Sequence, residues 1–147
     1  MHKKILSFSF LLPFLSNIAF ANCPQPQTIS YQCHMIKGRN ICTWGPDNGW
    51  YQGNSDENPV KDGERLSPNA FTQAVWFPYN DDSHGATSCY YKGPYGETVN
   101  LFQQTGYGTV PPPVGSLWTK IRWEGFPYAL SCSSSAFACK FEFGEKT

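Results

Sequence analysis

Residues 28–44 have the sequence Thr-Ile-Ser-Tyr-Gln-Cys-His-Met-Ile-Lys-Gly-Arg-Asn-Ile-Cys-Thr-Trp, and this stretch decides the fold class. Strand-like runs lie on both sides of Lys37-Gly38. A two-residue turn at that point would place Cys33 and Cys42 directly opposite each other. Although Lys-Gly is not the favoured Asn-Gly turn pair, the stretch predicts a β-hairpin that is closed by its own disulfide.

The same strand pattern continues along the rest of the chain. Phe137, Cys139 and Phe141 alternate with Ala138 and Lys140, as the residues of a half-buried strand do. On this basis we expect strands at Thr28–Ile36, Asn40–Trp44, Phe71–Tyr79, Thr87–Lys92, Thr98–Gln104, Trp118–Trp123 and Phe137–Phe143.

Turn residues separate the expected strands. Clusters of Gly, Pro, Asn and Asp lie between them. One short helical turn is expected to run into Phe71–Val75, because Ser67 can cap it and Pro68 can take its first position. Short strands joined by such turns predict a mainly β chain, a single compact antiparallel β-sandwich or barrel-like domain with disulfides.

Length, composition and charge exclude several classes of protein. The chain has 147 residues, which corresponds to about one ordinary domain. It is 40% hydrophobic and 15% charged, which excludes a disordered chain. Basic and acidic residues number 11 each, and this balance argues against a nucleic-acid partner, which would select a basic surface.

The N-terminus resembles a secretory signal. Lys3 and Lys4 precede an apolar run, and small residues at Ala19 and Ala21 predict cleavage after residue 21. We therefore expect a signal peptide at 1–21 and one domain at 22–147, in the periplasm or secreted, with no stable membrane insertion after cleavage. A lipoprotein is the less favoured alternative, because Asn22 before the first Cys fits a lipidation signal poorly.

The cysteine count predicts a disulfide framework. All six Cys follow the expected cleavage site, and an even number in an exported chain of this size is typical of disulfides rather than of zinc ligands. Spacing favours three bridges: Cys33 with Cys42, Cys132 with Cys139, and Cys23 with Cys89. Other connectivities stay open on spacing alone.

One string has the composition of a catalytic site. Asp81, Asp82 and His84 lie within four positions, and carboxylates with an imidazole can bind a metal or transfer protons. Asn, Asp, Ser and Gly are also the residues that a turn between strands prefers, and we favour a turn here. Since the common catalytic and nucleotide-binding motifs are absent from the sequence, we expect no catalytic residue, no metal and no cofactor.

Aromatic residues give the strongest positive signal for function. The chain has 11 Phe, 8 Tyr and 5 Trp. Exposed rings on a β-scaffold can stack on sugars or anchor a protein interface. Packing in a small core is the competing explanation for each ring. The expected binding residues are those in or beside loops, with two cations on the strand after Trp118: Trp44, Trp50, Tyr51, Trp118, Lys120 and Arg122.

The chain also resembles an uncharacterised family of small exported bacterial proteins, domain of unknown function 3757. The matching elements are Cys23-Pro24, Gly49-Trp50-x-x-Gly53, Phe71-x-x-Ala74, Cys89-x-Tyr91 and Cys132 to Cys139-x-Phe141. The resemblance implies export in a Gram-negative bacterium and a single-domain architecture. It implies no activity, because the family has none established.

These observations together predict an exported, non-catalytic binding protein that engages a glycan or a protein partner through loop aromatics. The first alternative is a periplasmic inhibitor or immunity-type protein. A small exported hydrolase built on Asp81, Asp82 and His84 is the third hypothesis. The sequence indicates neither the identity of the partner nor the oligomeric state.

Overall fold

Ten strands carry the fold, and all their pairings are antiparallel. The structure is a computed structural model that describes residues 20–46, 50–52, 60–78, 85–103 and 110–142. Within these ranges the strands are β1 (Phe20–Asn22), β2 (Ser30–Ile36), β3 (Arg39–Gly45), β4 (Trp50–Gln52), β5 (Phe71–Pro78), β6 (Gly85–Lys92), β7 (Thr98–Gln103), β8 (Thr119–Trp123), β9 (Phe126–Cys132) and β10 (Lys140–Glu142). A three-residue 3-10 helix, Pro26–Thr28, precedes β2.

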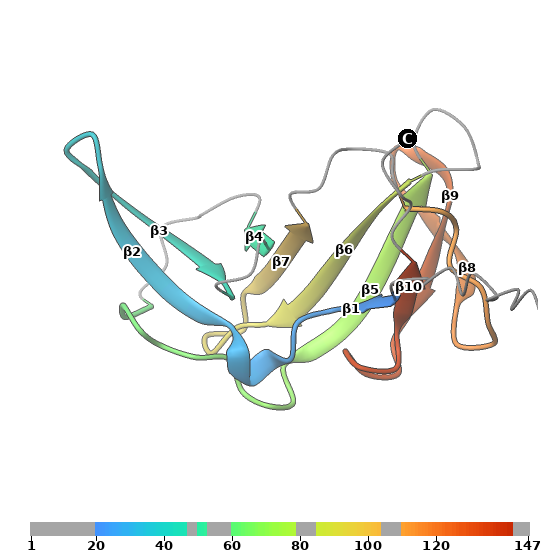
Figure 1. Cartoon of the computed structure of the whole chain (residues 1–147), viewed down its shortest axis with the longest axis horizontal. Coiled ribbons are helices and arrows are strands. Elements are labelled where there is room, and N and C mark those ends of the chain that lie inside the picture. The colour runs from blue at the N-terminus through green and yellow to red at the C-terminus, as the bar shows by residue number, and fades with distance from the viewer. Residues whose placement is uncertain (1–19, 47–49, 53–59, 79–84, 104–109, 143–147) are drawn as a thin grey trace, which may run out of the picture.

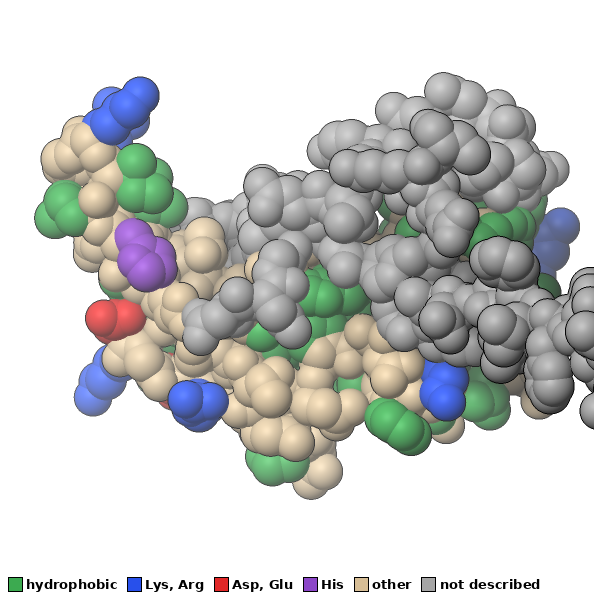
Figure 2. Space-filling model, in the orientation of Figure 1, with side chains coloured by type: hydrophobic (Ala, Val, Ile, Leu, Met, Phe, Trp, Pro, Cys, Tyr) green, Lys and Arg blue, Asp and Glu red, His purple; other side chains and the backbone are tan. Residues whose placement is uncertain are grey.

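The hairpin of β2 and β3 has the register that its sequence predicts. Cys33 pairs with Cys42, and the Cα atoms of this disulfide are 4.0 Å apart. Lys37 and Gly38 both have positive φ, 48° and 76°, as a two-residue type I′ turn requires. The hairpin extends away from the large sheet (Figure 1), and hydrophobic and cationic side chains gather at its far end (Figure 2).

Six strands form the main sheet, in the order β4-β7-β6-β5-β9-β8. β4 and β8 are its edges, so among the described strands the sheet is open and does not close into a barrel. Two further pairs, β1 with β10 and β2 with β3, complete the layers (Figure 1). The mainly β class and the antiparallel arrangement are therefore confirmed.

The core lies on one side of the main sheet, which we call the inner face. Alternation places on it the paired residues Ala74, Trp76, Cys89, Leu101 and Cys132. The smaller sheets cover these side chains, and one hydrophobic cluster joins them to residues of those sheets and of the segments beside them: Cys23, Ile29, Tyr31, Trp44, Cys139 and Phe141. The opposite side is the outer face.

All three expected disulfides are present. Cys23–Cys89 links the segment after β1 to β6, and Cys132–Cys139 closes the loop between β9 and β10. Each of the six Cys is bridged, so the chain carries no free thiol. Three disulfides indicate a protein that folds in an oxidising compartment.

Three local expectations are wrong. Residues 67–70 form a turn, closed by the Ala70 amide on the Ser67 carbonyl, and Phe71 begins a strand rather than a helix. Residues 137–139 also form a turn, because the Ser135 side chain and carbonyl accept the amides of Ala138 and Cys139. β9 was not expected, since Pro127 breaks its pattern, yet it lies between β5 and β8.

Candidate functional site

Two of the expected binding residues belong to the core. The side chain of Trp44 is 0% exposed and lies 5.2 Å from the Tyr31 ring. Trp50 is 7% exposed and makes an edge contact with Phe141 at 6.2 Å. Their assignment to a binding surface is therefore wrong, because inner-face packing takes up both indoles. Tyr51 pairs with β7 through its backbone, and its side chain lies outside the described residues.

The other three expected residues, Trp118, Lys120 and Arg122, lie at or beside the β8 edge. Trp118 is half-buried against the core, and its Nε1 donates to the Lys140 carbonyl at 3.1 Å. Lys120 places its Nζ 4.3 Å from the centre of the Tyr128 ring. Arg122 is exposed. Trp118, expected as a binding residue, packs partly against the core cluster, while Trp123 lies on the outer face.

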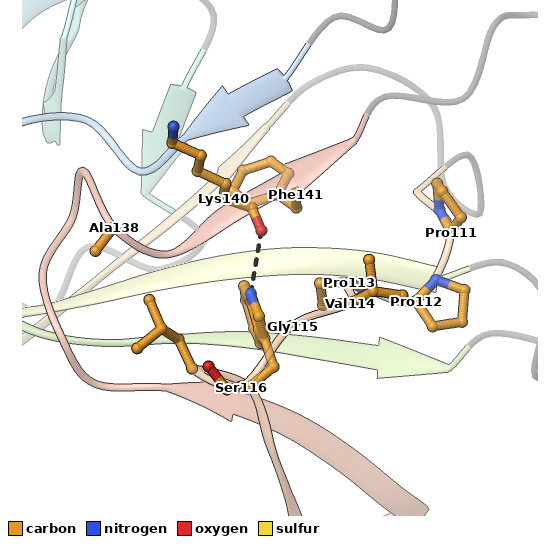
Figure 3. A pocket seen from close by; sticks show the side chains of 11 residues that line it. Pro111, Pro112, Pro113, Val114, Gly115, Ser116, Ala138, Lys140 and Phe141 are labelled. Atoms are coloured by element: carbon orange, nitrogen blue, oxygen red, sulfur yellow. Dashed lines mark hydrogen bonds between the residues drawn. The ribbon is translucent and has the colours of Figure 1, made fainter.

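A groove runs beside Trp118. It has a volume of about 640 Å³. The residues that line it belong to the proline run at 111–113, to residues 114–118 and to β10 (Figure 3). Val114 and Leu117 expose apolar surface to it. Among the described residues that line it, Lys140 alone is charged. The groove therefore offers apolar contact with few directed polar groups.

The outer face carries a continuous run of aromatic side chains. The Tyr90 and Trp123 ring centres are 5.8 Å apart, Trp123 and Phe77 5.4 Å, and Phe77 and Phe126 4.9 Å. We call these four side chains the aromatic array. Phe126 is 39% exposed and the other three are half-buried. The rings are tilted against one another by 39° to 73°, so the array is contoured rather than flat.

A β-bulge brings Phe126 into the array. Ile121 pairs with Ala129 and Trp123 pairs with Phe126, so β9 has one residue more than β8 between these pairs. Strict alternation would have put Phe126 on the inner face together with Tyr128. The extra residue, at Pro127, reverses the alternation, and proline is tolerated in a bulge because its missing N–H leaves no ladder bond unmade.

Small residues make room for the array. Val75, Ser88 and Ala129 are buried, and they occupy the same outer face on β5, β6 and β9. Because these side chains are short, they project little from the sheet, and large rings can lie across them. This explains how Trp123 of β8 reaches Tyr90 of β6, although β5 and β9 lie between these two strands.

Neutral polar groups adjoin the rings. Ser131 Oγ donates to Gln73 Oε1 at 3.0 Å on this face. Burial raises the pKa of Tyr90, and the side chains of Ser88 and Asn100 beside the phenol lower it by less. These two contacts are weak, since neither Ser88 Oγ nor Asn100 Oδ1 has a hydrogen-bond partner of good geometry. Both oxygens are buried, so the neutral polar surface beside the array comes from the half-buried side chains of Gln73 and Asn100.

The outer face is almost free of charge. Of the side chains that register and alternation assign to it in the described strands, only Lys92 at the end of β6 is ionised. Aromatic rings with neutral donors and acceptors suit a neutral ligand that has both apolar and hydroxyl-bearing surface. They are a poor match for a phosphate or a carboxylate, which would call for Arg or Lys.

The sequence indicated parts of this site without assembling it. Trp123 and Tyr90 belong to the aromatic surplus, but Phe77 and Phe126 had no signal beyond strand alternation. Only the strand order and the bulge show that these rings meet on the outer face.

The catalytic and metal-binding alternatives receive no support here. Asp81, Asp82 and His84 lie outside the described residues. Within the ranges that the structure describes, no three His, Cys, Asp or Glu side chains are grouped as metal ligands would be. None of the helices in those ranges is long and apolar enough to cross a membrane.

Comparison with known proteins gives no relative for this fold and face. No family model, curated protein or solved structure matches the chain. The functional argument therefore depends on the geometry of the outer face alone.

Proposed function

We propose that this chain is an exported, non-catalytic binding protein that engages a neutral glycan through the aromatic array. The observation that carries this proposal is the unbroken series of ring contacts from Tyr90 through Trp123 and Phe77 to Phe126. Neutral hydroxyl and amide side chains lie beside these rings, and one cation, Lys92, lies at their margin. Pyranose rings present apolar C–H faces that pack on aromatic rings and hydroxyls that need hydrogen-bond partners. The array supplies the aromatic surface, and the half-buried amide side chains of Gln73 and Asn100 are the polar groups that we assign to the sugar hydroxyls.

Export supports this role. The N-terminal signal pattern and three disulfides agree with a periplasmic or secreted protein, where polysaccharides are abundant. Membership of the uncharacterised exported family stays a prediction from the short sequence elements that suggested it. The ring of Phe126 is the most exposed of the array and is therefore the first contact that we assign to a sugar.

A protein partner is the second candidate, in keeping with an inhibitor or immunity-type role. The mutual tilt of the rings favours it, because a contoured aromatic surface can receive side chains of a partner as a hot spot. A tight one-to-one complex without glycan affinity would support this reading.

The test is polysaccharide affinity electrophoresis of the purified chain and of Phe126→Ala, followed by calorimetry with the oligosaccharides that retard it. We expect the variant to lose about tenfold in affinity, because one stacking contact is worth about 1.4 kcal/mol. The matched control is Phe137→Ala, which removes a ring that is 62% exposed and lies outside the array.

Both variants change exposed rings, so their thermal midpoints should stay close to that of the parent chain. Loss of affinity in Phe126→Ala alone supports the proposal. If both variants are retarded as strongly as the parent chain, the glycan binds elsewhere. If no polysaccharide retards the parent chain, the protein partner is favoured.

A further inference from the structure

The end of the β2–β3 hairpin is an exposed apolar and cationic surface, separate from the aromatic array. Met35 is 72% exposed, Ile36 49% and Ile41 42%. These side chains lie around the turn at Lys37-Gly38, at the point of the hairpin that stands farthest from the sheet (Figures 1 and 2). Aliphatic side chains this exposed, gathered at one tip, mark a contact surface.

The apolar side chains lie on both sides of the two-stranded ribbon. Register pairs Ile36 with Arg39 and His34 with Ile41, so these four residues share one side. Met35 pairs with Asn40 on the other side. A partner that packs against a sheet face would need apolar groups on one side only. Because the hairpin has apolar groups on both sides, its binding partner is better explained as a medium that contacts both sides of the ribbon at once.

The charge of the hairpin is of one sign. Lys37 and Arg39 flank the turn, and β2 and β3 contain no acidic residue. Asp62 approaches the middle of β2, where its Oδ1 accepts the Cys33 amide at 3.0 Å. Exposed aliphatic groups beside Lys and Arg are the combination that binds anionic lipid interfaces, where the apolar groups enter the headgroup layer and the cations meet phosphates.

The disulfide holds this surface in place. The Cys33–Cys42 bridge lies two residues behind Met35. Nearer the base of β2, the Tyr31 amide donates to the Glu64 carbonyl and the Tyr31 carbonyl accepts the Gly63 amide. The tip is therefore preorganised to project, and little conformational entropy is lost when it binds.

From these observations we propose that the hairpin tip docks on an anionic lipid bilayer by shallow, reversible insertion of Ile36, Ile41 and Met35 into the headgroup region. Lys37 and Arg39 pair with lipid phosphates. The contact is peripheral, and it would hold the aromatic array near a membrane surface without a membrane-spanning segment.

The test is cosedimentation of the purified, disulfide-bonded chain with vesicles of phosphatidylcholine alone and of phosphatidylcholine with about one third phosphatidylglycerol. We expect binding to the mixed vesicles, weakening as salt rises, and at least tenfold weaker binding to phosphatidylcholine.

Two double variants separate the contributions. Ile36→Ser with Ile41→Ser should lower the partition coefficient about tenfold, since it removes the inserted groups. Lys37→Asn with Arg39→Gln should lower it about 25-fold, at about fivefold for each charge near an anionic surface. Asn at position 37 tolerates the positive φ of the turn. Val114→Ser, which changes an exposed aliphatic residue far from the hairpin, should leave binding unchanged.

All of these side chains are exposed, so the thermal midpoint of each variant should remain that of the parent. Hairpin-dependent binding to the mixed vesicles supports the proposal. The proposal is overturned if the parent chain does not bind the mixed vesicles, or if the hairpin variants bind them as well as the parent does. Either result would favour a protein cleft as the partner of the tip. Glycan affinity is measured separately, so either proposal can fail without the other.

Discussion

Tyr90 and Trp123 lie on β6 and β8, which are separated by two strands, yet their ring centres are 5.8 Å apart. The indole therefore lies across the outer face instead of standing at the sheet edge. Such a crossing is possible because Ala129, between β8 and β5, has a side chain too short to obstruct it. Val75 and Ser88, the other small residues on this face, leave room for the array in the same way.

Removal of the Trp123 side chain should therefore break the array and cost stability as well. For Trp123→Ala we expect a loss of about 2 kcal/mol, less than the 3–5 kcal/mol of a fully buried aromatic because the ring is half-buried. Trp123→Phe should recover most of this loss. Urea denaturation gives both values, and a change below about 0.5 kcal/mol in the alanine variant would contradict the packing described.

Trp50 should behave as a core residue. Trp50→Ala should lower the free energy of unfolding by about 4 kcal/mol, because the side chain is buried against Phe141. Trp118→Ala, at the half-buried edge, should cost about 2 kcal/mol and should lose the hydrogen bond to Lys140. Chemical denaturation of both variants measures the two losses in the free energy of unfolding, and the test is which loss is larger. A larger loss in Trp118→Ala would contradict these burial assignments.

The disulfides should differ in their contribution to stability. Cys23–Cys89 closes a loop of 66 residues, and replacement of both Cys by Ala should cost about 4 kcal/mol. Cys33–Cys42 spans 9 residues, and its removal should cost about 2 to 3 kcal/mol. Non-reducing urea denaturation of the two double variants compares them. Equal losses would show that loop length does not govern the difference.

Stability should fall at alkaline pH. Burial raises the pKa of Tyr91 far above its usual range, and burial is also the main cause of the smaller rise at Tyr90. In the unfolded chain both phenols ionise near pH 10. The native state then binds more protons than the unfolded state, so the free energy of unfolding decreases as pH rises above about 10.

Denaturation curves between about pH 8 and pH 11 measure this slope. Tyr91→Phe should make the slope shallower. It should also cost about 1 kcal/mol at neutral pH, since the Tyr91 hydroxyl donates to the Pro24 carbonyl at 2.8 Å. Tyr95→Phe changes an exposed ring and serves as the control, which should keep the parent slope. If Tyr91→Phe keeps the parent slope of unfolding free energy against pH, the buried phenol is not the cause of that slope.

Local features of the fold were predictable and global ones were not. The hairpin turn at Lys37-Gly38 and the short Cys132–Cys139 loop depend on residues close in sequence, and both were expected correctly. Ser67–Ala70 was misassigned because a proline after Ser suits a β-turn as well as a helix start. β9 was missed because Pro127 is accommodated by a bulge that only the partner strand makes possible.

The candidate site was predictable only as a class of residue. An aromatic surplus in a small disulfide-rich chain indicates that some rings serve the core and others the surface, but composition does not assign them. Trp44 and Trp50, beside turn residues, were expected outside and are buried. Phe126 follows a turn glycine and carries the most exposed ring of the array.

The sequence by itself determined the β class, the two short-range cysteine pairs (Cys33–Cys42 and Cys132–Cys139) and the sign of charge on the hairpin, because period-two alternation, turn residues and short spacings act within a few residues. Only the tertiary structure decided which side of each strand is core. Each strand has two sides, and the choice between them depends on the strand order and on one extra residue in β9. That choice buried Trp50 and placed Trp123 over Tyr90.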